Sequence, residues 1–136
     1  MILVDSNILM YSAGADHPNK ALAVAFLEKV SCGEVNATID AAVLREIIHR
    51  YRALSRWADG RAVYVLAREI FPNVLAVTGK VMDRALELVD ADAGLSARDA
   101  VHAAVVQVYG LEGICTFDRD FDRVPGCHRV EPSAGL

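Results

Sequence analysis

Short apolar runs alternate along this chain with longer segments of helical periodicity, and this alternation constrains the fold more than any other feature. The apolar runs are predicted to be strands, at residues 2–4, 35–39, 74–77 and 114–117, with an edge strand at 129–131. The segments between them are predicted to be helical, at residues 7–12, 18–32, 41–58, 61–71, 80–92 and 96–109. Strands and helices that alternate in this way build parallel sheets with helices on both faces. We therefore predict an α/β fold, a three-layer α/β/α domain around a short parallel central sheet.

Local signals predict several helix boundaries. Pro18 fits the first turn of a helix, and Gly33 lies just past the end of the same helix. The pair Asp59-Gly60 is a turn signal, so we expect it to terminate the long helix over 41–58.

The composition limits the class of protein. A chain of 136 residues is expected to form a single domain over residues 1–136, and 54% hydrophobic residues supply a substantial core, which excludes a disordered chain. The net charge of −4 gives no general attraction to nucleic acid. Any nucleic-acid binding must therefore depend on a local basic patch or on a bound metal ion.

The cysteines and the N-terminus predict the compartment. Cys32, Cys115 and Cys127 form no C-x-x-C pair, so we assign them to packing and not to a disulfide or a zinc site. The N-terminus lacks the basic start and the long apolar core of a signal peptide, and no apolar run is long enough to span a bilayer. We expect a cytoplasmic protein with no membrane partner.

Two aspartates directly follow the most apolar predicted strands. Asp5 follows the run at 2–4, and Asp118 follows the run at 114–117. In open parallel sheets, ligands bind in the crevice outside the carboxyl ends of the strands. Because such ends lie at one edge of the sheet, these two carboxylates are predicted to face the same crevice.

Two further carboxylates are candidates, and each has a structural alternative. Asp99 lies in the first turn of a predicted helix, where Ser96 and Asp99 also match a capping box. Glu46 lies at the border of the apolar face of the helix over 41–58, where it could instead pair with Arg50 one turn later. Four carboxylates at one crevice would repel one another. Mg²⁺ or Mn²⁺, which prefer oxygen ligands, would relieve this repulsion and present a cation to phosphate.

The four acids lie in four ordered motifs, VDSNIL at 4–9, LREI at 44–47, ARDAVHAA at 97–104 and TFDRDF at 116–121. This set resembles the PIN-domain nucleases, and in length and layout the chain resembles the VapC-type toxins of bacterial toxin–antitoxin pairs. The resemblance implies an Mg²⁺- or Mn²⁺-dependent endoribonuclease, the toxin of a type II toxin–antitoxin system, which hydrolyses RNA phosphodiester bonds with metal-activated water. It also implies a homodimer and a small VapB-type antitoxin as partner.

Carried over position by position, the resemblance assigns residues to the site. The catalytic and metal-binding residues it implies are Asp5, Glu46, Asp99 and Asp118. The supporting polar positions are Asn7, Thr116 and Asp120.

The helix over 41–58 also predicts a basic stripe opposite its apolar face. Arg45, His49, Arg52 and Arg56 follow at spacings of four, three and four residues. We interpret the three arginines as contacts for the RNA backbone. The alternatives are a solvated helix face or a surface that binds a partner protein.

The helix over 96–109 carries two further features. His102 lies three residues after Asp99 in an otherwise apolar segment, and we interpret it as a hydrogen-bonded structural histidine, with a general acid as the alternative. The small and apolar residues at 103–108 would suit a subunit interface.

Other classes of protein remain as alternatives. A receiver-like or phosphoryl-transfer domain needs a lysine near the last strands, but the only lysines are Lys20, Lys29 and Lys80. A haloacid-dehalogenase-type phosphatase needs Asp-x-Asp after the first strand, where position 7 is asparagine. A pure binding module would show no Mg²⁺-dependent activity. A PIN domain that acts in RNA processing would have no antitoxin.

Overall fold

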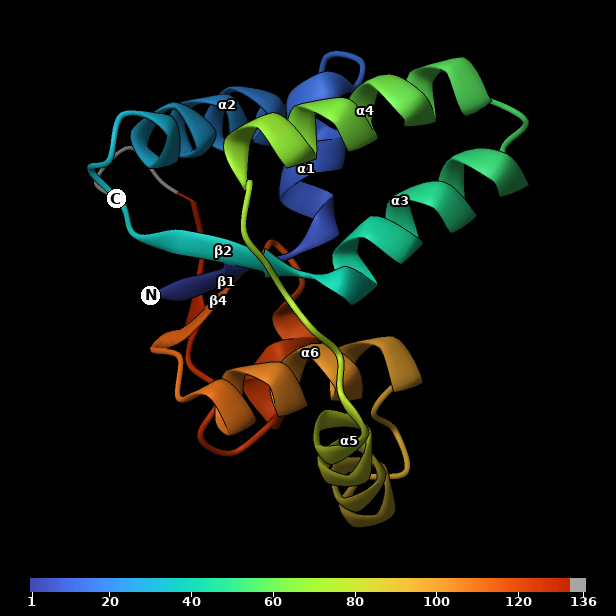
Figure 1. The fold of residues 1–136 in the computed structure, drawn as a ribbon, viewed down its shortest axis with the longest axis vertical. Coiled ribbons are helices and arrows are strands. Elements are labelled where there is room, and N and C mark those ends of the chain that lie inside the picture. The colour runs from blue at the N-terminus through green and yellow to red at the C-terminus, as the bar shows by residue number, and fades with distance from the viewer. Residues whose placement is uncertain (133–136) are drawn as a thin grey trace.

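The computed structural model describes residues 1–132, and its strands form one parallel sheet (Figure 1). The strands are β1 (Ile2–Val4), β2 (Ala37–Asp40), β3 (Val74–Leu75), β4 (Gly113–Cys115) and β5 (Arg129–Val130). They are ordered β3-β2-β1-β4-β5, and each pairing is parallel. In the register, Leu3 of β1 lies between Thr38 of β2 and Ile114 of β4. The carboxyl end of β1 is therefore at the centre of one sheet edge.

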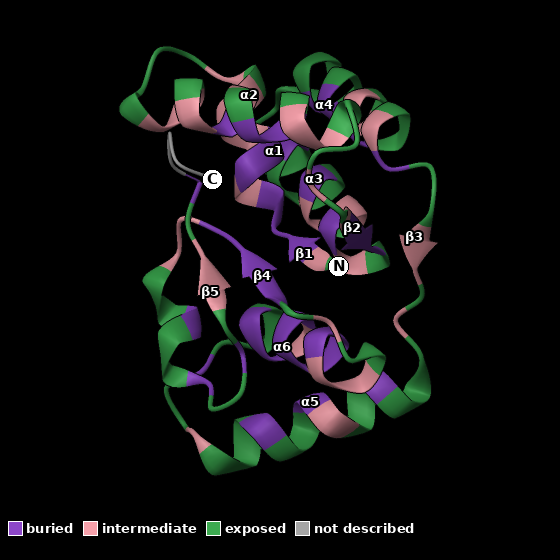
Figure 2. Ribbon diagram, turned by 90° about the vertical axis from the view of Figure 1, so that its left-hand side faces the viewer, coloured by how far each residue is buried: buried purple, intermediate pink, exposed green. Residues whose placement is uncertain are grey.

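Helices cover both faces of the sheet (Figures 1 and 2). One face is covered by α1 (Ser6–Ala13), α2 (Pro18–Ser31), α3 (Ala41–Ala53) and α4 (Trp57–Ile70). The other face is covered by α5 (Gly79–Ala91) and α6 (Ala97–Tyr109), with the short 3₁₀ helix η1 (Arg119–Arg123) beside them.

Alternate side chains of the central strands enter two separate cores. Leu3 and Ile114 are fully buried against α5 and α6, whereas Val4 and Cys115 are fully buried against the helices on the opposite face. A strand that is buried on both faces is apolar at successive positions, because side chains alternate between the two faces. This arrangement confirms the predicted three-layer α/β/α fold with a short parallel sheet.

The boundary between α3 and α4 differs from the prediction. Helix α3 ends at Ala53, and α4 begins at Trp57, so Gly60 lies inside α4 and does not terminate a helix. The chain reverses at Ser55, whose φ of 54° is in the left-handed region. A β-carbon on Gly60 would clash with the β-carbon of Tyr51, so the glycine permits the close approach of α3 and α4.

Other local predictions are corrected as well. The residues from Ala103 to Val106 lie on the buried side of α6 and pack in the core, so of the segment predicted for a subunit interface only Gln107 and Val108 reach the surface. Cys115 and Cys127 are buried, as packing residues should be, but Cys32 is exposed. Each of these outcomes depends on which neighbour covers the side chain, and helical periodicity does not specify that neighbour.

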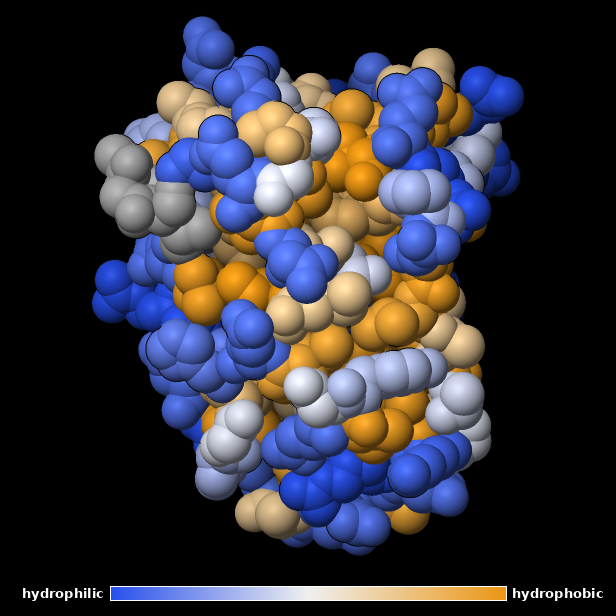
Figure 3. Space-filling model, turned by 60° about the vertical axis from the view of Figure 1, so that its left-hand side comes forward, coloured by the Kyte–Doolittle hydropathy of each residue, from blue (hydrophilic) through white to orange (hydrophobic). Residues whose placement is uncertain are grey.

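Some large hydrophobic side chains remain on the surface. They include Ile48, Leu54, Met82, Leu86 and Val89. Figure 3 shows one face of the molecule on which hydrophobic surface lies between hydrophilic patches.

Within residues 1–132, no helix is long and apolar enough to cross a membrane.

Candidate active site

Asp5 is fixed at the centre of the sheet edge. It directly follows β1, is fully buried and caps α1, where its Oδ1 accepts a 2.7 Å hydrogen bond from the N–H of Ser6. Its own N–H donates to the carbonyl of Cys115 at 3.0 Å, which holds the end of β1 against β4. The sheet register therefore decides where this carboxylate points.

Thr116 connects three parts of the site through one hydroxyl. Its Oγ1 donates to Oδ2 of Asp5 at 2.8 Å. The same oxygen accepts from Nδ2 of Asn7 and from the backbone N–H of Asp118, each at 3.0 Å. The two polar positions expected to support the site, Asn7 and Thr116, are thus connected to Asp5 by hydrogen bonds.

The other three expected acids surround one guanidinium group. Nη1 of Arg98 lies 3.5 Å from Oε1 of Glu46, and its Nη2 lies 3.4 Å from Oδ1 of Asp99 and 3.3 Å from Oδ2 of Asp118. Ser6 links Asp5 to Glu46. Its N–H donates to Asp5, and its hydroxyl donates to Oε1 of Glu46 at 3.0 Å. The structure therefore gathers all four expected carboxylates at one place, which we call the acidic site.

The structural alternatives for two of these acids have different outcomes. Ser96 does cap α6, since its Oγ accepts from the N–H of Asp99 at 3.1 Å, yet the Asp99 carboxylate still reaches the acidic site. Among the ion pairs of residues 1–132, Glu46 has Arg98 and His102 as partners and not Arg50. Capping and site formation are compatible here because the start of α6 lies beside the strand ends.

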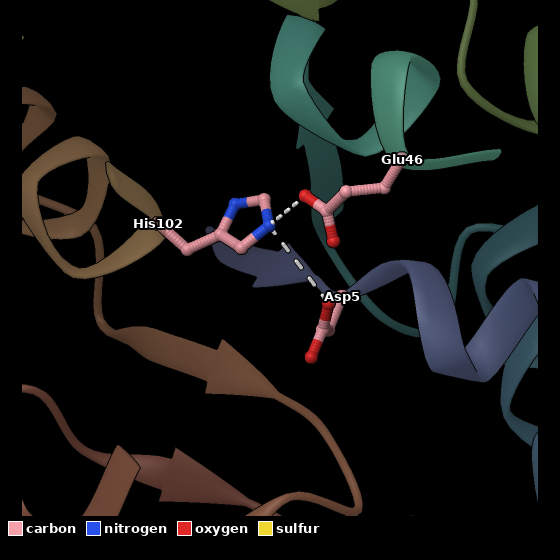
Figure 4. A group of neighbouring side chains, drawn as sticks. All are labelled: Asp5, Glu46 and His102. Atoms are coloured by element: carbon pink, nitrogen blue, oxygen red, sulfur yellow. Dashed lines mark hydrogen bonds and ion pairs between the residues drawn. The ribbon is translucent and has the colours of Figure 1, made fainter. Parts of the chain in front are cut away.

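His102 contacts several carboxylates inside the protein, and Figure 4 shows its contacts with Glu46 and Asp5. Its side chain is fully buried, with Nδ1 2.7 Å from Oδ2 of Asp40 and Nε2 2.5 Å from Oε2 of Glu46. Nε2 is also 3.9 Å from Oδ1 of Asp5. This arrangement confirms the interpretation of His102 as a hydrogen-bonded structural histidine.

Asp40 was missed by sequence reasoning. It ends β2, is fully buried and caps α3 through a 2.9 Å hydrogen bond from the N–H of Val43. The signal that selected Asp5, an aspartate directly after an apolar strand, applies equally to Asp40. The strand predicted over 35–39 places Asp40 directly after its end, so the same rule could have identified this residue.

Burial shifts the protonation equilibria of the site. It raises the pKa of Asp5, and it also raises the pKa of Asp99, because the charged form of each loses hydration. Burial alone would lower the pKa of His102, but Asp40 and Glu46 hold that pKa well above its ordinary value. The two carboxylates therefore favour the protonated form of His102, in which each ring nitrogen can donate to one of them.

The donor set fits a hard divalent cation. Oxygen atoms of Asp99, Asp118 and Asp120 lie within 4.8 Å of one another, and so do ligand atoms of Asp5, Glu46 and His102. Carboxylate oxygens are the preferred ligands of Mg²⁺ and Mn²⁺. His102 is better suited to orient Glu46 than to bind metal, since both of its ring nitrogens already contact carboxylates.

The side-chain oxygen of Asn7 also supports a metal ion at this site. Oδ1 of Asn7 has no hydrogen-bond partner within the described part of the chain, although Nδ2 of the same amide is bound to Thr116. A buried acceptor without a partner costs free energy, which a water molecule in the coordination shell of a metal would recover.

The predicted basic stripe is only partly formed. Arg45 and Arg52 lie on α3 and, with His49, line a shallow groove. Arg56 lies beyond the end of α3, where it pairs with Asp59 at 2.9 Å, so its inclusion in one helical stripe is wrong. Because α3 ends at Ala53, Arg56 instead precedes α4 and lines the groove that α1, α3 and α4 form.

A larger groove opens beside the acidic site. Its volume is about 1040 Å³, and its walls include residues of α1, α3 and α4 together with Arg98. The walls contain both apolar side chains, such as Met10 and Leu66, and polar ones, such as His49 and Arg50. The groove can therefore accept a ligand with both apolar and charged groups.

Comparison with known proteins decides the family. The family model described as PIN domain matches residues 2–126. The chain belongs to the PIN-domain family. Among curated PIN-domain relatives, ribonuclease VapC13 of Mycobacterium tuberculosis is 38% identical over 130 residues, which cover 96% of this chain and 99% of the relative. Ribonuclease VapC23 of the same organism is 33% identical over 118 residues, or 87% of this chain and 93% of the relative.

Solved structures share the fold. A toxin–antitoxin complex from Klebsiella pneumoniae matches with a TM-score of 0.69 and 21% identity over 98% of both chains. VapC20 of M. tuberculosis, described as a sarcin-ricin loop cleaving toxin, matches with a TM-score of 0.72 and 24% identity over 97% of this chain and all of that chain. The chain thus belongs to the PIN-domain family and has VapC ribonucleases as relatives, and this membership excludes the receiver-like and dehalogenase-like alternatives.

Proposed function

We propose that this PIN-domain protein is an Mg²⁺- or Mn²⁺-dependent endoribonuclease and the toxin of a type II toxin–antitoxin pair. The observation that carries the proposal is the convergence of Asp5, Glu46, Asp99 and Asp118 at one edge of the sheet. Curated relatives named VapC ribonucleases, similar over nearly their whole length, support the same function.

Each carboxylate has a role that follows from its surroundings. Asp5 and Asp99, the most buried of the four, would hold the metal ion as primary ligands. Asp118 would complete the coordination from the loop after β4. A divalent ion bound there supplies Lewis-acid chemistry, since it polarises phosphate and lowers the pKa of a coordinated water.

Glu46 is suited to orient the attacking water. His102 occupies its Oε2, which leaves Oε1 as the oxygen that faces Arg98 and Ser6 at the front of the site. The fixed position of the carboxylate would select one direction of attack on phosphorus. Attack by water leaves a 5′-phosphate and a free 3′-hydroxyl on the RNA products.

The decisive test compares two aspartates. Asp5→Asn is expected to lower Mn²⁺-dependent RNA cleavage by more than about 100-fold, because a primary ligand is lost. The variant should keep the native fold in EDTA, since relief of the burial penalty on the Asp5 charge offsets the loss of one acceptor for Thr116. Asp83→Asn, on the exposed side of α5, removes the same charge away from the site and serves as the matched control.

The readout is the rate of cleavage of a defined RNA with Mn²⁺ or EDTA, with the chemistry of the new ends mapped. Products that carry a 2′,3′-cyclic phosphate would contradict hydrolysis by metal-activated water. Full activity of Asp5→Asn would contradict the assignment of the site.

The groove beside the site supports the proposed antitoxin partner. A small VapB-type protein could fill its mixed apolar and basic surface and exclude RNA from the acidic site. Co-expression with a small protein encoded beside this chain should yield a stable complex with reduced RNase activity. We also propose a homodimer, for which sedimentation of the purified chain is the measurement.

Arg45 and Arg52 remain proposed contacts for the RNA backbone. They share one groove on α3, and phosphate contacts release counterions from single-stranded nucleic acid. Replacing both by glutamine should reduce the slope of log affinity against log salt by about 1.4. Arg68→Gln, an exposed site in the last turn of α4, is the control. An unchanged slope in the double variant would reject this surface.

A further inference from the structure

Arg98 lies at a position that the assigned roles do not explain. It is the second residue of α6, and its neighbour in sequence is Asp99. Its guanidinium contacts carboxylates from three separate parts of the chain, namely α3, α6 and the loop after β4. No other arginine of residues 1–132 contacts more than two carboxylates.

The contacts of Arg98 are long. They measure 3.3–3.5 Å, and each involves a different carboxylate, so none forms the paired fork that makes an arginine–carboxylate bond strong. The Arg56–Asp59 and Arg123–Asp92 pairs of the same protein are 2.9 and 2.7 Å long. Arg98 is therefore held mainly by the summed negative charge and can exchange its partners.

The charges favour a cation at this point. Burial alone would lower the pKa of Arg98, but Asp5, Glu46, Asp99 and Asp118 raise it. The same carboxylates are the groups available to a divalent ion. Because each oxygen cannot fully serve both, the guanidinium and the ion are alternatives.

The groove beside the acidic site leaves room for the Arg98 side chain to move. Its side chain is 42% exposed, and it lines the groove beside Asn7 and His49. A rotation of its long side chain toward the groove would free the carboxylates without moving the backbone of α6.

We propose that Arg98 is an internal counter-cation of the acidic site, which a divalent ion must displace, so that Arg98 sets the affinity of the site for metal. This inference rests on the metal site of the proposed function and deepens it. Arg98 stabilises the site before the ion binds and opposes the ion when it arrives.

The test measures Mn²⁺ binding to the full-length protein by isothermal titration calorimetry after EDTA treatment. Arg98→Gln is expected to bind Mn²⁺ about tenfold more tightly than the parent, because the ion no longer competes with three ion pairs. Arg98→Lys keeps the charge but not the three-way reach and should lie between the two. Arg68→Gln removes the same charge at an exposed site on α4 and should bind like the parent.

A second measurement uses the parent protein itself. The Nε–Hε NMR signal of Arg98, assigned by its loss in Arg98→Lys, should move toward the position of exposed arginines as Mg²⁺ is added. A signal that stays unchanged at saturating Mg²⁺ would overturn the proposed displacement, even if the glutamine variant failed to fold.

The outcomes separate this inference from the proposed function. Equal or weaker Mn²⁺ binding by Arg98→Gln would overturn the role of Arg98 and leave the metal-dependent nuclease intact. If the parent and all variants bound no Mn²⁺, the proposed metal site would be wrong, and the inference would fall with it.

Discussion

Asp40 and His102 form a fully buried pair, with Oδ2 of the aspartate 2.7 Å from Nδ1 of the histidine. The aspartate begins the helix that carries Glu46, and the histidine contacts Glu46 directly. One rigid connection therefore runs from the end of β2 through α6 to a carboxylate of the acidic site. The contact with His102 holds the Glu46 side chain in place, although α3, which carries Glu46, is half-exposed.

Replacement of His102 should separate stability from positioning. His102→Ala leaves Asp40 as a buried charge without its partner and is expected to lower the free energy of unfolding by about 3–5 kcal/mol. His102→Gln can still donate to Glu46, whereas His102→Asn can donate only toward Asp40. We expect similar melting temperatures for the last two variants but faster RNA cleavage by His102→Gln. Equal cleavage rates would show that His102 does not position Glu46.

The protonation of His102 predicts how stability depends on pH. Since Asp40 and Glu46 hold its pKa well above the ordinary value, the folded protein retains a proton that the unfolded chain loses. The resulting stabilisation is complete below about pH 6.5 and decreases as the pH rises toward the folded-state pKa, by up to about 1.4 kcal/mol per pH unit. Urea unfolding in EDTA at pH 6, 7 and 8 measures this decrease. His102→Gln should show a flatter profile, and a parallel profile would assign the effect to other groups.

Gly60 is predicted to be a packing residue. Gly60→Ala should destabilise the protein by about 1–3 kcal/mol, because the new methyl group would clash with Tyr51 across the α3–α4 contact. Gly79, at the start of α5, has open space around its α-carbon and gives the matched control. Gly79→Ala should be neutral or slightly stabilising. Chemical denaturation of the two variants compares them directly, and equal stabilities would contradict the proposed clash.

The Thr116 hydroxyl should matter more than the size of its side chain. Thr116→Val keeps the shape but removes the donor to Asp5 and the acceptor for the N–H of Asp118, at a cost of about 1–3 kcal/mol. Thr116→Ser restores both hydrogen bonds and should recover most of the stability and of the Mn²⁺ affinity. Thermal unfolding with and without Mn²⁺ measures both effects. A valine variant as stable and as responsive to Mn²⁺ as the parent would exclude this role.

The sequence by itself determined the layers of the fold and the main acids of the site. Runs such as Ile2-Leu3-Val4 are short and apolar at consecutive positions, as expected of strands covered on both faces, and helical periodicity located the helices between them. Asp5 and Asp118 could be predicted because a parallel sheet places the carboxyl ends of its strands at one edge. These properties depend on local pattern and on general rules of topology.

Only the tertiary structure decided the remaining contacts. Gly60 has the same local signal whether it ends a helix or lets two helices approach, and Tyr51 on the neighbouring helix decides between them. The pairing of His102 with Asp40 and the position of Arg98 among the acids join residues far apart in the chain. Such contacts depend on distances between elements, which are set by the packing of whole layers and not by the residues on either side in sequence.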